Sequence, residues 1–170
     1  AQATIAALQA ELGRYKEREP QWQNEVKQAK EQLAALQAQV IEIHQQAGFA
    51  GLALQAKRDF VAGYGADSAF RAEHPEAWSR SQPLLMTHLT ELAAHHHATA
   101  QTTRDAAQVQ EAARWYRAWL DSFPDAAEAP RQHFLLAELL YEAGQFGPAA
   151  AEYEIAAYRV PGQPHGADAG

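Results

Sequence analysis

The sequence predicts an all-α fold in which an N-terminal coiled-coil helix is followed by helical hairpins stacked as an α-solenoid. Three observations predict it. Apolar residues recur at steps of three and four over the first 47 positions, and two later segments repeat at a constant offset. Alanine supplies 39 of the 170 residues, which favours close contact between helices over the packing of strands. The length fits one domain, or a small domain with an extension.

Composition excludes several classes of protein. The chain has no cysteine, so it has no disulfide scaffold, no thiolate zinc site and no cysteine nucleophile. Its net charge of −7 argues against nucleic acid as a partner. No apolar run approaches the roughly 20 residues that a membrane-spanning helix needs, so we expect no transmembrane segment. The charge is uneven, with a net of +1 over residues 1–58, −2 over 59–104 and −6 over 105–170, which suggests parts with different surfaces.

Residues 1–47 are predicted to form a coiled-coil helix. A hydrophobic period of 3.5 residues, kept over several heptads, is typical of a left-handed coiled coil. We therefore expect the chain to form a homo-oligomer through this helix, with the strand number left open. The alternative is an amphipathic helix that packs on its own domain. Tyr15, Ala29 and Ala47 keep the register of the predicted oligomer seam, which consists of Ile5, Leu8, Leu12, Trp22, Val26, Leu33, Leu36, Val40 and Ile43.

Two adjacent residues interrupt this helix. Glu19 places a charge in the seam, and Pro20 removes a backbone donor and crowds the preceding turn. We expect a kink or a local break near residues 19–20, and the unbroken register favours a single rod. Gly48 and Gly51 are expected to end the helix.

Residues 48–83 are predicted to be a junction of helices and loops. Turn signals occur at Gly63 and Gly65 and at the two Xaa-Pro pairs ending in Pro75 and Pro83. Between them we expect a helix over 53–62 and a short helical piece over 76–79 that carries Trp78. A third helix is expected over 84–99, where apolar residues follow the helical period.

An internal repeat occupies the last third of the chain. Segments 111–124 and 148–161 share Ala, Ala, Tyr and Pro at an offset of 37 residues. The paired residues are Ala112 and Ala149, Ala113 and Ala150, Tyr116 and Tyr153, and Pro124 and Pro161. Between the segments we expect a helix that ends at Glu142, a turn at Gly144 and a second helix that opens near Pro148.

These residues resemble the tetratricopeptide repeat (TPR), a helical hairpin of about 34 residues. The residues that carry the resemblance are Leu136, Ala137, Leu140, Gly144, Phe146, Ala149, Tyr153, Ala156 and Pro161. Repeats are expected over about 84–124 and 130–161, within a repeat region spanning 84–170. The first copy has Ala107 where the family has its turn glycine. Because neither a polar cap nor a third repeat is evident, we expect the chain to be truncated at its C-terminus.

Together with the coiled coil, the repeats resemble bacterial cell-envelope proteins. This resemblance implies the periplasm or cell envelope of a Gram-negative bacterium, with the cytoplasm as the alternative. It also implies a concave groove, lined by the first helix of each hairpin, that binds a protein or peptide partner. Phe134 and Tyr141 could instead pack against a following repeat. Carried onto this sequence, the groove residues are Arg131, Phe134, Glu138, Tyr141 and Glu142, with His97, Gln101 and Arg104 from the weaker copy.

Two clusters invite a catalytic interpretation. In His95-His96-His97, consecutive side chains on a helix diverge by about 100°, so the three cannot converge on one ion; we expect one to be buried and two exposed. Glu138 and Glu142 could act as an acid and base pair, but no nucleophile or phosphate loop accompanies them. We therefore expect no enzyme, no metal site and no cofactor, but a protein-protein interaction scaffold. The alternatives are a structural subunit of a larger envelope assembly and a metal-dependent enzyme that uses the histidines.

Overall fold

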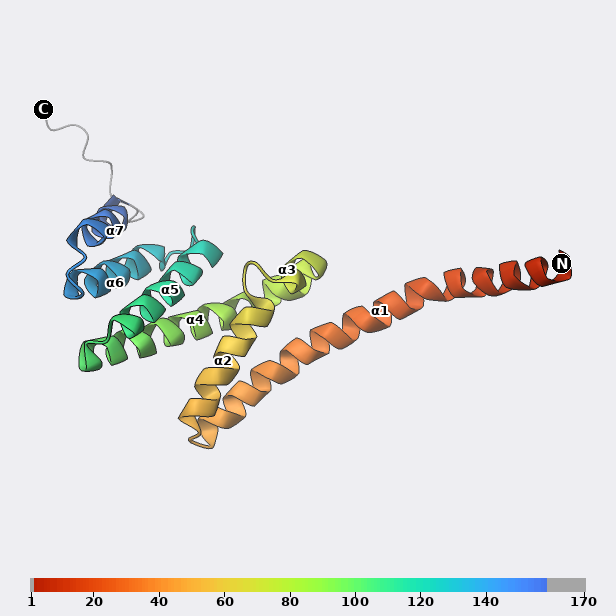
Figure 1. Ribbon diagram of the computed structural model, residues 1–170, viewed down its shortest axis with the longest axis horizontal. Coiled ribbons are helices and arrows are strands. Elements are labelled where there is room, and N and C mark those ends of the chain that lie inside the picture. The colour runs from red at the N-terminus through yellow and green to blue at the C-terminus, as the bar shows by residue number, and fades with distance from the viewer. Residues whose placement is uncertain (1, 159–170) are drawn as a thin grey trace, which may run out of the picture.

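The computed structural model describes residues 2–158. In that range it has seven α-helices and no strand, so the predicted all-α class is confirmed (Figure 1). The helices are α1 (Gln2–Gln46), α2 (Ala50–Tyr64), α3 (Ala69–Glu73), α4 (Pro75–Thr103), α5 (Ala106–Ser122), α6 (Ala129–Glu142) and α7 (Phe146–Tyr158). Residues 2–30 of α1 project from the rest of the molecule, and we call them the rod. Residues 31–158, which pack together, are called the body.

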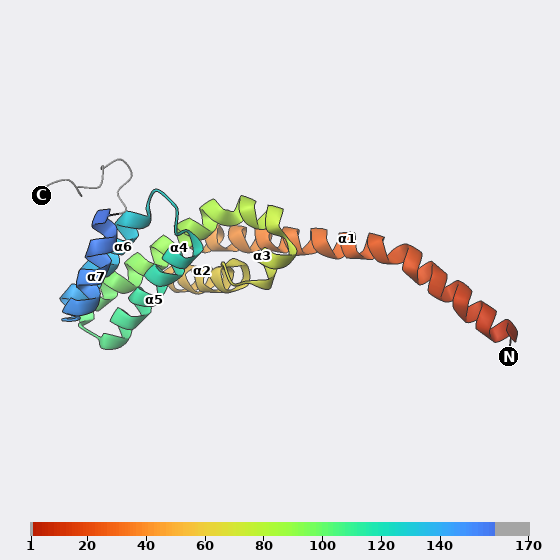
Figure 2. The same cartoon turned by 90° about the horizontal axis from the view of Figure 1, so that it is seen from above.

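The first helix is continuous through its internal proline. α1 runs for 45 residues with Pro20 inside it, so no break occurs at 19–20. Its axis changes direction in the N-terminal half, where Pro20 lies (Figure 2). A proline that lacks a donor and crowds the preceding turn is a usual cause of such a bend.

Two hairpins turn at glycines with the same geometry. Gly48 (φ 77°) follows α1, and Gly144 (φ 74°) follows α6. In each turn the glycine N–H and the next N–H bond back to carbonyls three and five residues earlier, as Gly144 does to Tyr141 (2.9 Å) and Gln145 to Leu140 (2.8 Å). This is the Schellman motif, which needs a left-handed residue. The predicted turn at Gly144 is confirmed, whereas Gly51 lies in the first turn of α2 and does not help to end α1.

Replacing Gly144 with alanine is expected to destabilise the chain by about 1–2 kcal/mol, the cost of a left-handed backbone for an L-residue with a Cβ. No atom lies within 4 Å of the Cβ position, so strain alone sets this cost. Urea unfolding followed by circular dichroism measures it. Gly147→Ala is the matched control, because Gly147 lies inside α7 and alanine favours helix. Equal destabilisation by both variants would contradict the prediction.

The middle of the chain is more regular than predicted. α2 extends the expected 53–62 helix at both ends, and the expected piece at 76–79 is the first turn of α4. α4 then continues through Pro83, so the predicted boundary between residues 83 and 84 falls inside one helix. Trp78, Leu85, Leu89 and Leu92 are all buried along α4. The free energy gained by burying side chains on both sides of Pro83 exceeds the cost of the backbone hydrogen bond that Pro83 cannot donate.

The turn between α4 and α5 precedes the position predicted from the repeat. Arg104 takes the left-handed conformation (φ 57°), and the side chain of Asp105 accepts a hydrogen bond from the N–H of Ala107 (2.9 Å). This N-cap starts α5 at Ala106, so Ala107 is helical and not the turn residue. A short polar side chain thus starts α5 without a turn glycine before it.

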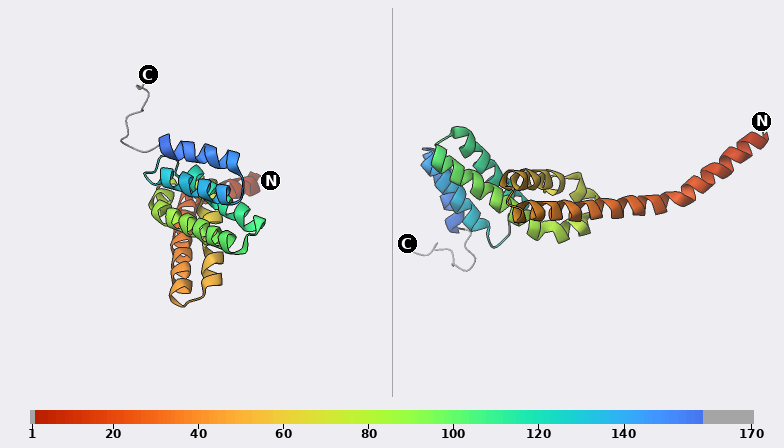
Figure 3. Two further views of the ribbon diagram at one scale, coloured as in Figure 1. Left: turned by 90° about the vertical axis from the view of Figure 1, so that its left-hand side faces the viewer. Right: turned by 90° about the horizontal axis from the view of Figure 1, so that it is seen from below.

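The core is one cluster that extends from the C-terminal part of α1 to α7. The layers of this stack are seen end-on in Figure 3 (left), with α7 at one end and the α1–α2 hairpin at the other. Ala112, Ala137 and Ala149 are each 0–1% exposed, as expected where helices cross closely. Pro161, the end of the second predicted repeat and the C-terminal residues to 170 lie outside the described residues.

Candidate functional site

The predicted seam is exposed along the whole of α1. Its side chains are between 43% and 61% accessible, from Trp22 to Leu8 and Ile43. α1 instead packs on the body through Ala34, Ala38 and Ile41. In the heptad register, where the seam holds positions a and d, these three residues hold b and f on the opposite side of the helix. Within one chain, α1 therefore packs on the body through the side opposite the seam, and the seam itself stays exposed.

The rod buries almost none of its side chains, although Lys30 at its end pairs with Glu73 of the body. Between residues 2 and 30 every residue except the half-buried Gly13 is exposed. Helices without tertiary contacts are marginal in water, and most of their stability in proteins comes from packing an apolar face. The exposed face of the rod is therefore the surface through which packing can stabilise it.

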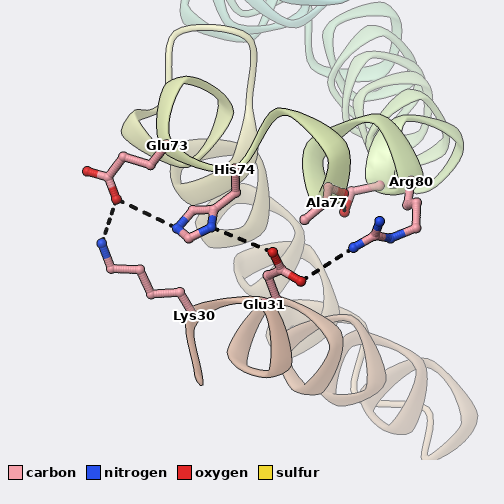
Figure 4. Close-up of polar contacts among 7 residues, drawn as sticks. Lys30, Glu31, Glu73, His74, Ala77 and Arg80 are labelled. Carbon is pink, nitrogen blue, oxygen red and sulfur yellow. Dashed lines mark hydrogen bonds and ion pairs between the residues drawn. The ribbon is translucent and has the colours of Figure 1, made fainter. Parts of the chain in front are cut away.

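A charged cluster joins α1 to the corner between α3 and α4 (Figure 4). Lys30 Nζ lies 2.5 Å from Glu73 Oε2, and Arg80 lies 3.4 Å from Glu31 Oε2. The hydrogen bond from Lys30 holds the pKa of the Glu73 carboxyl below its usual range. His74 lies between the two carboxylates, 3.7 Å from each, and is only 4% exposed. These contacts link the end of the rod to the corner between α3 and α4.

The structure brings together predicted groove residues from α4 and α6. Gln101 Nε2 donates to both carboxylate oxygens of Glu142, at 2.9 and 3.0 Å. His97 Nε2 lies 3.6 Å from the same carboxylate. Residues 41 positions apart in sequence therefore meet, as expected if the first helices of two hairpins are neighbours.

Beside these contacts lies a hollow of about 570 Å³, the α4–α6 hollow. Its lining combines the predicted Gln101, Arg104 and Glu142 with Ala100, Val109, Leu139 and Ala143. The last four were not predicted from the sequence. Small and aliphatic residues carry no chemical signal, and Val109 belongs to α5, which was not expected to reach the groove.

A tyrosine fixes one groove residue in each hairpin. The hydroxyl of Tyr116 on α5 lies 2.9 Å from His97 Nδ1, and the hydroxyl of Tyr153 on α7 donates to Glu138. Burial raises the pKa of Tyr116 to about 12, and the hydrogen bond to Glu138 raises that of Tyr153 to about 12, so both stay protonated. The 37-residue repeat contained this signal, since it pairs these two tyrosines.

The other predicted groove residues lie apart from the hollow. Phe134 packs on Tyr153 and Tyr141 on Phe146, with ring centroids 5.7 and 5.2 Å apart. Both remain about half exposed, and Arg131 is also exposed. The predicted groove set is thus divided between the α4–α6 hollow and an aromatic face shared by α6 and α7.

The prediction that one histidine of the run 95–97 is buried and two are exposed is wrong. Two of the three, His96 and His97, are buried, and only His95 is exposed. α4 is covered on one side by α2 and on another by α5, so neighbouring side chains are both enclosed. His96 Nε2 accepts from Arg58 (2.7 Å) and its Nδ1 lies 2.8 Å from Gln108 Oε1, so both ring nitrogens are occupied. Within residues 2–158, no three His, Cys, Asp or Glu side chains gather as metal ligands.

Acidification is expected to destabilise the body through His88. Burial lowers the pKa of this side chain from its ordinary value of 6.5, a shift that Lys57 reinforces and Glu91 partly opposes. At a pH below 6.5, His88 binds a proton in the unfolded chain but not in the folded chain. The free energy of unfolding therefore falls as the pH decreases toward the pKa that His88 has in the folded chain. Urea unfolding at pH 7.5 and 5.5 should show the loss, and His88→Gln should reduce it. An unchanged pH dependence in the variant would contradict this assignment.

Comparisons with known proteins do not identify the chain. A scan against protein-family models found no match, nor did searches of curated proteins and of solved structures. Over residues 2–158 none of the helices combines the length and apolar content that crossing a bilayer requires.

Proposed function

We propose that this chain is a non-enzymatic scaffold for protein-protein interaction. α1 joins copies of the chain into a coiled-coil oligomer, and the TPR-like groove along α4 and α6 binds a protein or peptide partner. The observation that carries the proposal is the apolar seam, which stays exposed over the full length of α1 and faces away from the body.

Sedimentation of the full chain tests the oligomer. A mass that is a defined multiple of 18.7 kDa is expected, together with high helical content. A chain that stays at the monomer mass at high micromolar concentration would contradict the proposal.

Several groups in the groove can recognise a partner. Arg104 supplies a forked donor, Gln101 an amide, and Val109 and Leu139 an apolar floor. Peptides selected from a displayed library against the full chain are expected to lose affinity when Arg104 is replaced by Glu. Arg117→Glu is the matched control, because Arg117 is exposed on α5 and does not line the α4–α6 hollow. Equal loss with both variants would show non-specific charge attraction and no groove.

One observation favours a second candidate, a structural subunit of a larger assembly of the cell envelope. Phe134, Tyr141, Phe146 and Tyr158 leave an exposed aromatic face on α6 and α7, 48–72% accessible. Such a face suits burial against another folded element. Substituting Tyr141 and Phe146 with Ser would then disrupt assembly without affecting peptide binding in the groove. We place either function in the periplasm or cell envelope, with the cytoplasm as the alternative.

A further inference from the structure

A second hollow opens beside the seam where the rod meets the body. It has a volume of about 380 Å³. Four of its lining residues, Glu19, Trp22, Gln23 and Val26, come from consecutive positions a, d, e and a of the α1 heptads. Lys27, Lys30 and the buried His74 complete it on the side of the body.

These four positions are those that receive a side chain in a coiled coil. When two helices pair parallel and in register, a residue at d inserts between the a, d and e residues of its partner and the a residue of the next heptad. For Trp22 that set is Glu19, Trp22, Gln23 and Val26, the same residues that line the hollow. The hollow therefore matches the site that would receive Trp22 from a second copy.

From this match we infer, as a consequence of the proposed function, that α1 of a second copy runs parallel to α1 and in register. The indole of Trp22 from each copy occupies the Trp22 hollow of the other. Trp22 is the largest side chain of the seam, and it is 43% exposed while the other three tryptophans are buried. His74 adds a lining residue from the body, and the two lysines can contact the indole face as cations.

Antiparallel pairing fits this hollow less well. In that arrangement the same four positions receive a side chain at a, and in this chain those are Ile, Leu, Val, Ala or Glu19. None has the size of an indole. An aliphatic residue at a would leave more of the 380 Å³ hollow unfilled than an indole does.

The charges beside the seam also favour the parallel pair. In parallel pairing, position g of one helix faces the following e of the other. This brings Glu11 to Lys16 and Glu25 to Lys30, and places no two like charges at facing g and e positions. Lys30 already lies 2.5 Å from Glu73, so it would be shared between two carboxylates. In antiparallel pairing e faces e, and the e positions carry two lysines and no acid.

The apolar contacts between the body and α1 lie opposite the seam, at positions b and f, through Ala34, Ala38 and Ile41. Beside the hollow the body approaches α1 through Glu73 and His74. Glu19, the one charge in the seam, would lie next to Arg18 of the second copy, which carries the opposite charge. In register, the two Glu19 carboxylates face each other in one layer of the seam, and the two Arg18 guanidinium groups beside them offset this repulsion.

Single-cysteine variants of the full chain test the orientation without background, because the chain has no cysteine. Leu8→Cys and Leu36→Cys, both at position d, are each expected to form a disulfide-linked pair of identical chains on oxidation. Gln28→Cys, at the exposed position c, is the control and should not. A defined oligomer in which neither seam variant links to itself would overturn the parallel orientation and leave the proposed scaffold standing. A chain that is monomeric by mass would overturn both.

The role of Trp22 has its own test. Trp22→Ala is expected to weaken self-association at least about tenfold, the scale of a central aromatic residue at an interface. Leu52→Ala is the control, since Leu52 is 55% exposed on α2 and lies off the seam. In the wild type, acrylamide quenching of tryptophan fluorescence should decrease as the chain concentration rises, and Trp22→Phe should lose that dependence. Association and quenching that match the wild type in both variants would exclude the seating of Trp22 in the hollow.

Discussion

Trp119→Ala is expected to destabilise the body by about 3–5 kcal/mol, the cost of truncating a fully buried large aromatic residue. Trp119 has no exposed surface. Its Nε1–H donates to Thr90 Oγ1 at 3.0 Å, and its ring packs edge-on against Phe123 at 5.5 Å. The substitution therefore leaves a cavity between α4 and α5 and removes a hydrogen bond from Thr90.

Urea unfolding followed by circular dichroism measures this loss. Tyr158→Ala is the control, because Tyr158 is 72% exposed and surface substitutions usually change stability by less than about 0.5 kcal/mol. A loss below about 1 kcal/mol for Trp119→Ala would show that α4 and α5 do not pack as described.

Leu33→Asp combined with Leu36→Asp is expected to convert the oligomer into monomers while the body stays folded. Both leucines are more than half exposed and face away from the body, so the change does not disturb the packing within one chain. In an oligomer they would be buried, and burying unpaired carboxylates costs several kcal/mol each. Association should weaken by at least about a hundredfold.

Sedimentation gives the mass of this double variant, and thermal unfolding reports on the body. Leu52→Asp is the matched control, since Leu52 has similar exposure but lies on α2. If the double variant keeps the wild-type mass, copies do not associate through the seam.

The sequence predicted those features that local chemistry determines. The heptad spacing keeps its register on both sides of Pro20 and therefore favoured a single rod. α1 is indeed one continuous helix. Gly144 was predicted as a turn residue because only glycine takes a left-handed backbone without cost. The burial of Ala137 and Ala149 followed from the small residues that crossing helices require.

The features that tertiary packing determines were missed. Pro83 is a strong signal for a helix end, yet burial of Leu85 and Trp78 on either side keeps α4 continuous. The burial of both His96 and His97 depends on α2 and α5 covering two sides of one helix, which the sequence of α4 does not specify. The charged cluster between α1 and the corner of α3 and α4 was not predicted either. Its ion pair joins Lys30 to Glu73, which lie 43 positions apart on two separate helices.

The groove illustrates both cases. The resemblance to the TPR family implied that Gln101 and Glu142 share a surface, and the two side chains meet at 2.9 Å. It did not predict that Phe134 and Tyr141 would contact aromatic residues of α7, because the angle between the two helices of a hairpin is set by the side chains that fill it.

The two sides of α1 have a consequence for the strength of binding. In the parallel arrangement an oligomer joined through the seam would place all of its bodies, and with them all of its grooves, at the same end of the rods. A partner that displays several copies of one short ligand could then engage two grooves at once. The second contact would occur at the high effective concentration created by the first, so two weak sites could together give a long-lived complex.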